Sequence, residues 1–250
     1  MSLFCTIWRR EVASFFLMPA SYAVVTFFLA LMGLSFWLMV QMLMLGHVAT
    51  PVSQVMFGES LFFWMAMLMV PPLITMRCVA EERRIGTMEL LMTAPVGDAT
   101  VALGKFAGAL TVFLLLWIPT LSYVFYLSKL APYATPLDVG ALAGAYVGIG
   151  LIGAFFLSIG LFASTCTRNQ MVAAISSFSL IAMYFFMGFT PRFTELPLLH
   201  QSAHYISCLT HMIDFSRGVL DSRPVVLYLS LTALMLFMSV KSIESRKWKA

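Results

Sequence analysis

The sequence predicts an all-α integral membrane protein with six transmembrane helices, an N-terminal interfacial helix and a cytoplasmic helix between the second and third spans. Composition is the first indication. Of the 250 residues, 61% are hydrophobic and 10% are charged, whereas soluble domains carry about 25% charged residues. The second indication is that the apolar residues form long uncharged runs, near the roughly 20 residues that a spanning helix needs. We expect a single transmembrane domain over residues 1–250.

The spans are predicted from stretches that lack Asp, Glu, Lys and Arg, because charges are costly at the bilayer centre. These stretches are Val12–Gly58, Ser60–Met76, Phe106–Ser128, Val139–Thr167, Asn169–Pro191 and Pro224–Val240. The first is long enough for two spans, but the turn-like Gly46–Pro51 favours one span near Ala20–Leu45 and an external loop. In the second, Pro71-Pro72 should bend the helix or end its regular hydrogen bonding.

Residues 1–18 are predicted to lie in the membrane interface as a short amphipathic helix. Apolar residues recur there at near-helical spacing, with charged residues between them. The apolar set is Phe4, Trp8, Val12 and Phe15, and the charged set is Arg9, Arg10 and Glu11. A frayed terminus is the alternative.

Six spans put both termini on one side, and the basic residues indicate that this side is the cytoplasm. In that orientation the cytoplasmic segments hold Arg9, Arg10, Arg77, Arg83, Arg84, Lys105, Arg168, Lys241, Arg246, Lys247 and Lys249. The external segments hold only Lys129, Arg192, Arg217 and Arg223. Because the basic residues are scattered singly and form no stripe with aromatic residues, nucleic-acid binding is not expected.

Glycines recur at four-residue spacing in two places: Gly104 and Gly108 at the start of the third span, and Gly140, Gly144 and Gly148 at the start of the fourth. Small residues at this spacing let membrane helices pack closely, since lipid offers no hydrophobic drive for their association. The pattern fits a close helix–helix or subunit contact, and it fits ordinary intramolecular packing equally well.

The longest charged cytoplasmic segment follows the second span. It covers residues 77–95, and its charged residues are Arg77, Glu81, Glu82, Arg83, Arg84 and Glu89. Ile85, Met88 and Met92 form an apolar stripe opposite these charges. The helix should stop near Thr93, because a proline follows at position 95. The pattern predicts a short amphipathic helix parallel to the membrane, either docked on a partner or solvated with none.

The run TMRCVAEERRIGTMELLMTAPV, followed by LGKFAGAL, resembles the signature of type-2 ABC exporter permeases. Three further stretches resemble the same family: WRREVASFFLMPASYAVV its N-terminal elbow helix, FSRGVLDSRPVVLYLS the start of its last span, and SIESRKWK its basic tail. The likeness is strongest to the branch of compact six-span permeases of gliding motility and nitrous-oxide-reductase maturation. It covers nearly the whole chain and is most specific at residues 75–106. It implies a multi-pass protein of the bacterial cytoplasmic (inner) membrane.

In that family an acidic pair, a basic pair and Gly-Thr-x-Glu-Leu-Leu form a coupling helix that sits in a cleft of the ATPase subunit. Residue by residue, the resemblance gives this role to Glu81, Glu82, Arg83, Arg84, Gly86, Thr87 and Glu89. The partners it implies are ABC ATPase subunits and a second permease chain, in a homo- or heterodimer. An accessory membrane protein with an extracytoplasmic domain is also compatible with it. The expected function is ATP-driven export or extrusion of a substrate that the sequence does not identify.

The sequence predicts no enzyme. Gly104-Lys105 is followed by Phe106, and position 99 is Ala99, so the phosphate-binding loop GxxxxGK[ST] is missing. ATP and magnesium are therefore expected in a partner subunit, and no cofactor is expected in this chain. Neither GxSxG nor HExxH is present to indicate catalysis.

An external amphipathic segment is predicted over residues 190–223, and it supports a rival function. His200, His204, Cys208 and His211 share one face of a continuous helix and are candidate ligands for a metal or haem. At 1.5 Å per residue, however, the first and third would lie about 12 Å apart. We therefore assign no metal site. A further alternative is a non-transporting membrane scaffold driven by an ATPase, which would carry the same coupling helix.

Overall fold

The computed structural model describes residues 3–45, 51–86, 97–130, 138–188 and 205–245. Every regular element in these residues is a helix, and six helices are long and apolar enough to cross a membrane. The predicted fold class is thereby confirmed. The candidate spans are α2 (Pro19–Met44), the stretch Leu61–Ile85 that begins with α3 (Leu61–Thr75), α6 (Asp98–Trp117) continued by η2 (Ile118–Thr120) and α7 (Leu121–Leu130), α8 (Val139–Cys166), α9 (Gln170–Met187) and α12 (Ser222–Glu244).

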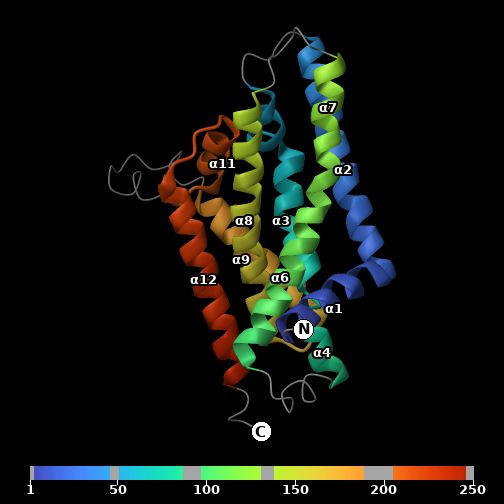
Figure 1. Cartoon of the computed structure of the whole chain (residues 1–250), viewed down its shortest axis with the longest axis vertical. Helices are drawn as coiled ribbons and strands as arrows, with labels where there is room; N and C mark the ends of the chain where they lie inside the picture. The colour runs from blue at the N-terminus through green and yellow to red at the C-terminus, as the bar shows by residue number, and fades with distance from the viewer. Residues whose placement is uncertain (1–2, 46–50, 87–96, 131–137, 189–204, 246–250) are drawn as a thin grey trace.

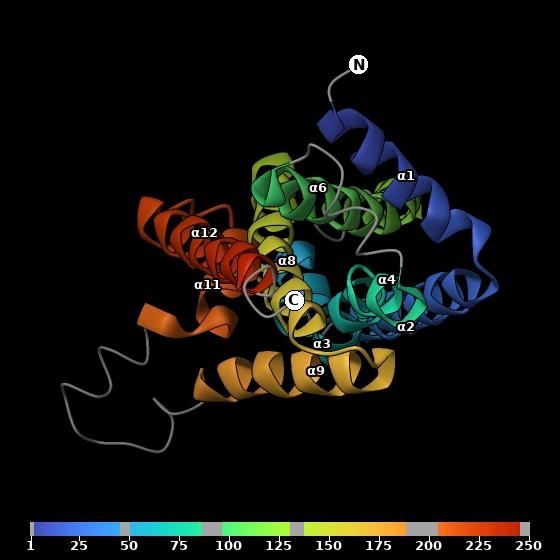
Figure 2. The ribbon, with the colours of Figure 1, turned by 90° about the horizontal axis from the view of Figure 1, so that it is seen from below.

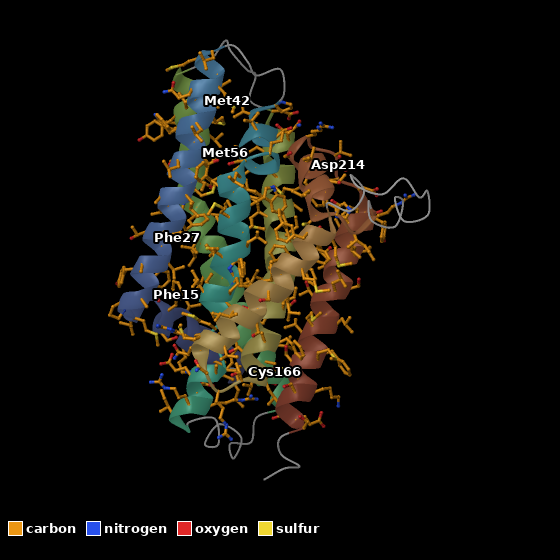
Figure 3. All side chains as sticks on the ribbon, turned by 180° about the vertical axis from the view of Figure 1, so that it is seen from behind. Phe15, Phe27, Met42, Met56, Cys166 and Asp214 are labelled. Atoms are coloured by element: carbon orange, nitrogen blue, oxygen red, sulfur yellow. The ribbon has the colours of Figure 1, made fainter. Side chains whose placement is uncertain are left out.

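Short elements lie at the two ends of the bundle (Figure 1). At one end are α1 (Leu3–Leu17), α4 (Ala80–Ile85) and the last turn of α12; at the other are η1 (Gln54–Gly58) and α11 (Cys208–Ser216). Side chains show the same division, because Cys166 lies at the α4 end and Met42 at the opposite end (Figure 3). Helix α1 and the C-terminal turn of α12 therefore lie at the same end of the bundle.

Helix α8 is the centre of the bundle and packs against α3, α6, α9, α11 and α12 (Figure 2). Its glycines let the neighbours approach closely. A Cβ atom at Gly153 would lie 2.2 Å from Cε1 of Phe113 in α6, and one at Gly160 would lie 2.0 Å from Oγ1 of Thr75 in α3. Side chains at these two positions would overlap with α6 and α3, so close packing depends on their absence.

An aromatic cluster joins three of the spans in the core. The ring centroid of Trp117 in α6 lies 4.9 Å from that of Phe28 in α2 and 5.6 Å from that of Phe63 in α3. Both distances fall in the range in which aromatic pairs attract each other. The cluster therefore fixes the packing of α2, α3 and α6.

The two prolines of the second span lie inside α3, which continues for three residues beyond them. Although their nitrogens cannot donate hydrogen bonds, their carbonyl oxygens accept them. The Thr75 hydroxyl donates to the Pro71 carbonyl at 2.8 Å, and the Met76 N–H donates to the Pro72 carbonyl at 2.9 Å. The helix ends at Thr75, and residues 76–79 turn into α4.

Helix α1 crosses the end of the bundle (Figure 2) and packs against α6. Met18 is extended, with φ −92° and ψ 133°, and Pro19 begins α2, so the chain turns sharply between the two helices. Ile7 is the buried residue of α1, whereas Phe4 of the predicted apolar stripe is 38% exposed. The indole N–H of Trp8 donates to the Thr111 hydroxyl of α6 at 2.9 Å.

Candidate functional site

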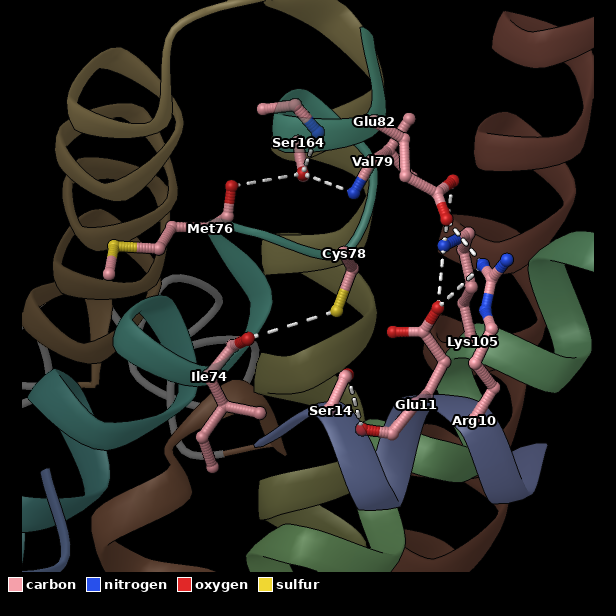
Figure 4. Close-up of polar contacts among 11 residues, drawn as sticks. Arg10, Glu11, Ser14, Ile74, Met76, Cys78, Val79, Glu82, Lys105 and Ser164 are labelled. Atoms are coloured by element: carbon pink, nitrogen blue, oxygen red, sulfur yellow. Dashed lines mark hydrogen bonds and ion pairs between the residues drawn. The ribbon is translucent and has the colours of Figure 1, made fainter. Parts of the chain in front are cut away.

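Helix α4 is the described part of the predicted coupling helix. Its first residues are hydrogen-bonded to α8. The backbone N–H groups of Val79 and Ala80 both donate to the Ser164 hydroxyl at 3.1 Å (Figure 4). This hydroxyl of α8 therefore satisfies two donors that a helix start leaves without a partner. The charges of α4 also favour helix, because Glu81 and Glu82 lie in its first turn and Arg83 and Arg84 in its last.

The helix ends earlier than the sequence predicts. Gly86 has a φ of +82°, in the left-handed region, and stops α4 after Ile85 rather than near Thr93. A Cβ at Gly86 would meet nothing within 4 Å, so the backbone conformation is what favours glycine here. Thr87, Glu89 and the remaining residues to 96 lie outside the described part of the chain.

A buried lysine joins α4 to two other helices. The ammonium of Lys105 in α6 lies 2.7 Å from the Glu11 carboxylate of α1 and 2.9 Å from the Glu82 carboxylate of α4 (Figure 4). The Lys105 side chain has no exposed surface, and those of Glu11 and Glu82 are 14% and 18% exposed. Removing one partner of a buried ion pair costs about 3–5 kcal/mol, because the remaining charge loses its compensation.

Arg10 completes the group, which we call the ion-pair cluster: Arg10, Glu11, Glu82 and Lys105. Its guanidinium pairs with the Glu82 carboxylate and lies 3.3 Å from that of Glu11. Two positive and two negative charges therefore balance. Because the Arg10 side chain is 52% exposed, water screens its contribution, and Lys105 is the central cation.

Two of the predicted packing glycines make the cluster possible. A Cβ at Gly104 would lie 2.9 Å from Cγ2 of Ile7, and one at Gly108 would lie 2.6 Å from Cβ of Glu11. The backbone of α6 therefore approaches α1 closely on both sides of Lys105. This approach places the Glu11 carboxylate within reach of the ammonium.

The described members of the predicted coupling set have two kinds of environment. Glu81, Glu82 and Arg83 are partly buried against the protein itself, and Arg83 donates to the Thr165 carbonyl of α8. Arg84 and Gly86 are exposed. The surface that α4 offers to a partner is therefore its exposed end from Arg84 onward, while Glu82 and Arg83 hold the helix to the bundle.

A family model described as ABC-2 family transporter protein matches residues 12–239. The match covers most of the chain. The protein belongs to the ABC-2 transporter family. No curated relative matches the sequence significantly. The ABC-2 permease is thus a multi-pass membrane component of an ABC transporter, in a family that normally works with ABC ATPase subunits.

In this ABC-2 permease, the glycines of the fourth span lie against α11. A Cβ at Gly144 would lie 2.4 Å from the Phe215 carbonyl oxygen, and one at Gly148 would lie 2.7 Å from Cδ2 of the same residue. At Gly140 the nearest atom would be the carboxylate of Asp138, which caps the same helix. Gly144 and Gly148 therefore serve a contact within the chain.

The predicted histidine face is interrupted at Ser207. Ser207 has an extended backbone, with φ −67° and ψ 107°, and caps a new helix that begins at Cys208, so the predicted shared face is wrong. His200 and His204 lie outside the described residues. His211 is buried and its Nδ1 lies 3.0 Å from the Tyr228 hydroxyl. Within the described ranges no group of three potential ligands is present.

Cys208 is also poorly suited to bind a metal. Burial raises the pKa of its thiol to about 12, so the thiol stays protonated at neutral pH. Metals bind the thiolate. Cys208 lies at the start of α11 and is fully buried. Its side chain therefore packs in the interior as a small apolar residue does.

Sequence reasoning missed Lys105 and Glu11 as site residues of the permease. Both were used only as charges that define topology or an amphipathic pattern. One signal was available: Lys105 is a single charge at the start of a span, directly after a glycine of a four-residue repeat. A cation at a close helix contact requires an anion from the neighbouring helix. Which helix supplies it depends on the tertiary fold.

Proposed function

We propose that this chain is the membrane-spanning permease subunit of an ATP-driven exporter, coupled through α4 to a separate ATPase subunit. ATP and magnesium belong to that partner. The observation that carries the proposal is the ion-pair cluster, which ties α4 to α1 and α6 through one buried lysine. A short surface helix with no partner would not need such an attachment.

The contacts of α4 give it two attachments to the bundle. Glu82 pairs with Lys105 of α6, and Arg83 donates to Thr165 of α8. A force applied at the exposed end of α4 would therefore reach both spans and α1 together. Small displacements at one site change packed interfaces between discrete arrangements. Closure of the ATPase would act on the permease in this way.

The proposed orientation places the α1 and α4 end in the cytoplasm of a bacterial inner membrane, with both termini on that side. It is supported by the positive charges, which gather at this end. We further propose that two permease chains act together, as a homo- or heterodimer. The resemblance to the gliding-motility and nitrous-oxide-reductase-maturation branch supports a compact six-span exporter.

Photo-crosslinking from α4 tests the proposal. A photoreactive amino acid replaces the exposed Arg84 in the full-length protein, and crosslinked products from native membranes are identified by mass spectrometry. We expect a nucleotide-binding ATPase. The control position is Tyr22, which is 62% exposed on α2 and should not capture it. If position 84 captures no ATPase, or position 22 captures it equally, the proposed coupling is wrong.

Function is then measured with the captured ATPase. Its activity in liposomes with the wild-type permease is compared with that for Glu82→Gln, which removes a charge of the cluster. We expect the variant to retain the ATPase and lose most of the stimulation, because docking uses the exposed end of α4 and transmission uses Glu82. Equal stimulation by both proteins would contradict this mechanism.

A further inference from the structure

A cavity of about 260 Å³ lies beside the ion-pair cluster. It is bounded by α1, the first turns of α2, the last turn of α3, α4 and α6. Apolar side chains such as Phe15, Val24 and Val112 form much of its wall. Charged side chains of both signs also line it, and two of them lie outside the cluster: Arg77 and Glu81. An apolar wall with a few polar groups is typical of a ligand site.

Arg77 has no anionic partner among the described residues. Its Nη1 donates to the thioether sulfur of Met18 at 3.0 Å, and its Nε is buried without a hydrogen-bond partner among the described residues. A thioether is a weak acceptor, and a guanidinium carries five donors and is always charged. The arginine therefore has unused capacity to bind an anion, for which phosphate has a matching geometry.

Glu81 is the anionic group that lines the same cavity as Arg77. Its Oε2 is buried and has no hydrogen-bond partner among the described residues, whereas the carboxylate of Glu82 is held by Lys105. A buried carboxylate oxygen without a donor is costly. The cavity therefore offers one site for an anion and one for a hydrogen-bonding cation.

We propose that this cavity binds the headgroup of a phospholipid that carries a phosphate and a primary ammonium, as phosphatidylethanolamine does. The phosphate pairs with Arg77 and the ammonium with Glu81. The volume is below the roughly 300–1,000 Å³ of pockets that enclose whole drug-sized ligands, so the site takes the headgroup alone. The acyl chains remain in the bilayer, past the apolar wall.

The place of the cavity agrees with such a ligand. It adjoins α1, whose axis crosses the ends of the spans (Figure 2). A helix that lies along the membrane surface is at the depth of the headgroups. A lipid there would contact α1, α3 and α4 together, beside Arg10, Glu11 and Glu82 of the ion-pair cluster, which also line the cavity. Ile85 of the last turn lines this cavity, whereas the exposed Arg84, where we place the ATPase contact, does not.

Native mass spectrometry of the delipidated full-length protein tests the proposal. Equal concentrations of phosphatidylethanolamine, phosphatidylcholine and phosphatidylglycerol with identical acyl chains are added separately. We expect phosphatidylethanolamine to bind at least about tenfold more tightly than either, the effect of one charge-assisted hydrogen bond. The trimethylated ammonium of choline cannot donate a hydrogen bond, and the glycerol headgroup has no ammonium.

Variants assign the two contacts. Arg77→Gln should weaken binding of phosphatidylethanolamine about tenfold, the effect of losing one charge-assisted hydrogen bond, and Arg77→Lys should restore part of it. Glu81→Gln should remove the preference over phosphatidylglycerol. The control is Arg84→Gln, an exposed charge on the same helix outside the cavity, which should bind like the wild type.

Three results would overturn the proposal: equal wild-type binding of the three lipids, unchanged binding by Arg77→Gln, or complete displacement of bound lipid by millimolar inorganic phosphate. The last would identify a site for free phosphate. Size-exclusion chromatography shows whether each variant is folded. Where a variant does not fold, the lipid selectivity of the wild-type protein decides, because it requires no substitution.

Discussion

The ammonium of Lys105 lies 2.9 Å from the carboxylate of Glu82, so a residue of the third span holds α4 directly. The same ammonium lies 2.7 Å from Glu11 of α1. One buried cation thus joins three helices that are separate in the sequence. Because no other residue of the cluster has a fully buried side chain, Lys105 determines its stability.

We expect Lys105→Met to lower the free energy of unfolding by about 3–5 kcal/mol, because it leaves two carboxylates without their central cation. Thermal unfolding in detergent measures the effect. The control is Lys241→Met, since Lys241 pairs with Glu244 at 2.7 Å on an exposed surface and such pairs contribute less than about 1 kcal/mol. Equal losses for the two variants would show that the cluster is not a stabilising feature.

Gly108→Ala should weaken the contact between α1 and α6, because the new Cβ would lie 2.6 Å from Cβ of Glu11. Overpacking of this kind costs about 1–3 kcal/mol. Gly150→Ala is the control: its Cβ would meet only Cδ2 of Leu114, at 3.9 Å, so the better helix propensity of alanine should stabilise it slightly. Thermal unfolding that ranks the variants in the reverse order would contradict this account of α1.

Gly86→Ala should reduce copurification of the ATPase, since the left-handed conformation at φ +82° costs about 1–2 kcal/mol for a residue with a Cβ. The chain would then leave α4 in another direction. Gly86→Asn is the matched comparison, because asparagine tolerates this region. We expect the asparagine variant to retain the ATPase and the alanine variant to lose it. Identical behaviour of the two would exclude a role of the backbone conformation.

Ser164→Ala should loosen the start of α4, because it leaves the Val79 and Ala80 N–H groups without their acceptor. Cys78, which is buried there, should then react faster with a maleimide. The measurement uses a background in which the exposed Cys5 and Cys166 are replaced by serine. Ser158→Ala is the control, since the hydroxyl of Ser158 donates to Phe155 of its own helix. A rate unchanged by Ser164→Ala would mean that other contacts hold α4.

The orientation of the chain is tested with a membrane-impermeant maleimide. Cys166 is exposed at the α4 end (Figure 3) and should react only after the cells are permeabilised. In a background without Cys5 and Cys166, Leu220→Cys places an exposed thiol just before α12, at the opposite end. It should react in intact cells. The reverse pattern would place α4 outside the cytoplasm and remove the basis for ATPase coupling.

The sequence predicted the spans well and the site incompletely, for a physical reason. Uncharged runs identify spanning helices because the bilayer imposes one length and one chemistry on all of them. The ion-pair cluster arises from tertiary packing, in which Gly108 allows Glu11 to reach Lys105, and no local pattern contains that pairing. The end of α4 at Ile85 was not predicted, because the left-handed conformation of Gly86 is not visible in the periodicity of the apolar residues.

The pairing of Glu11 with Lys105 spans 94 positions of the chain, and this separation has a consequence for biosynthesis. Translation completes α1 well before it produces the lysine that neutralises its carboxylate. Until the third span leaves the ribosome, Glu11 lacks its buried cation and has only the exposed Arg10 of its own helix beside it. Its final docking is therefore a late event, and it occurs only after α6 has been inserted.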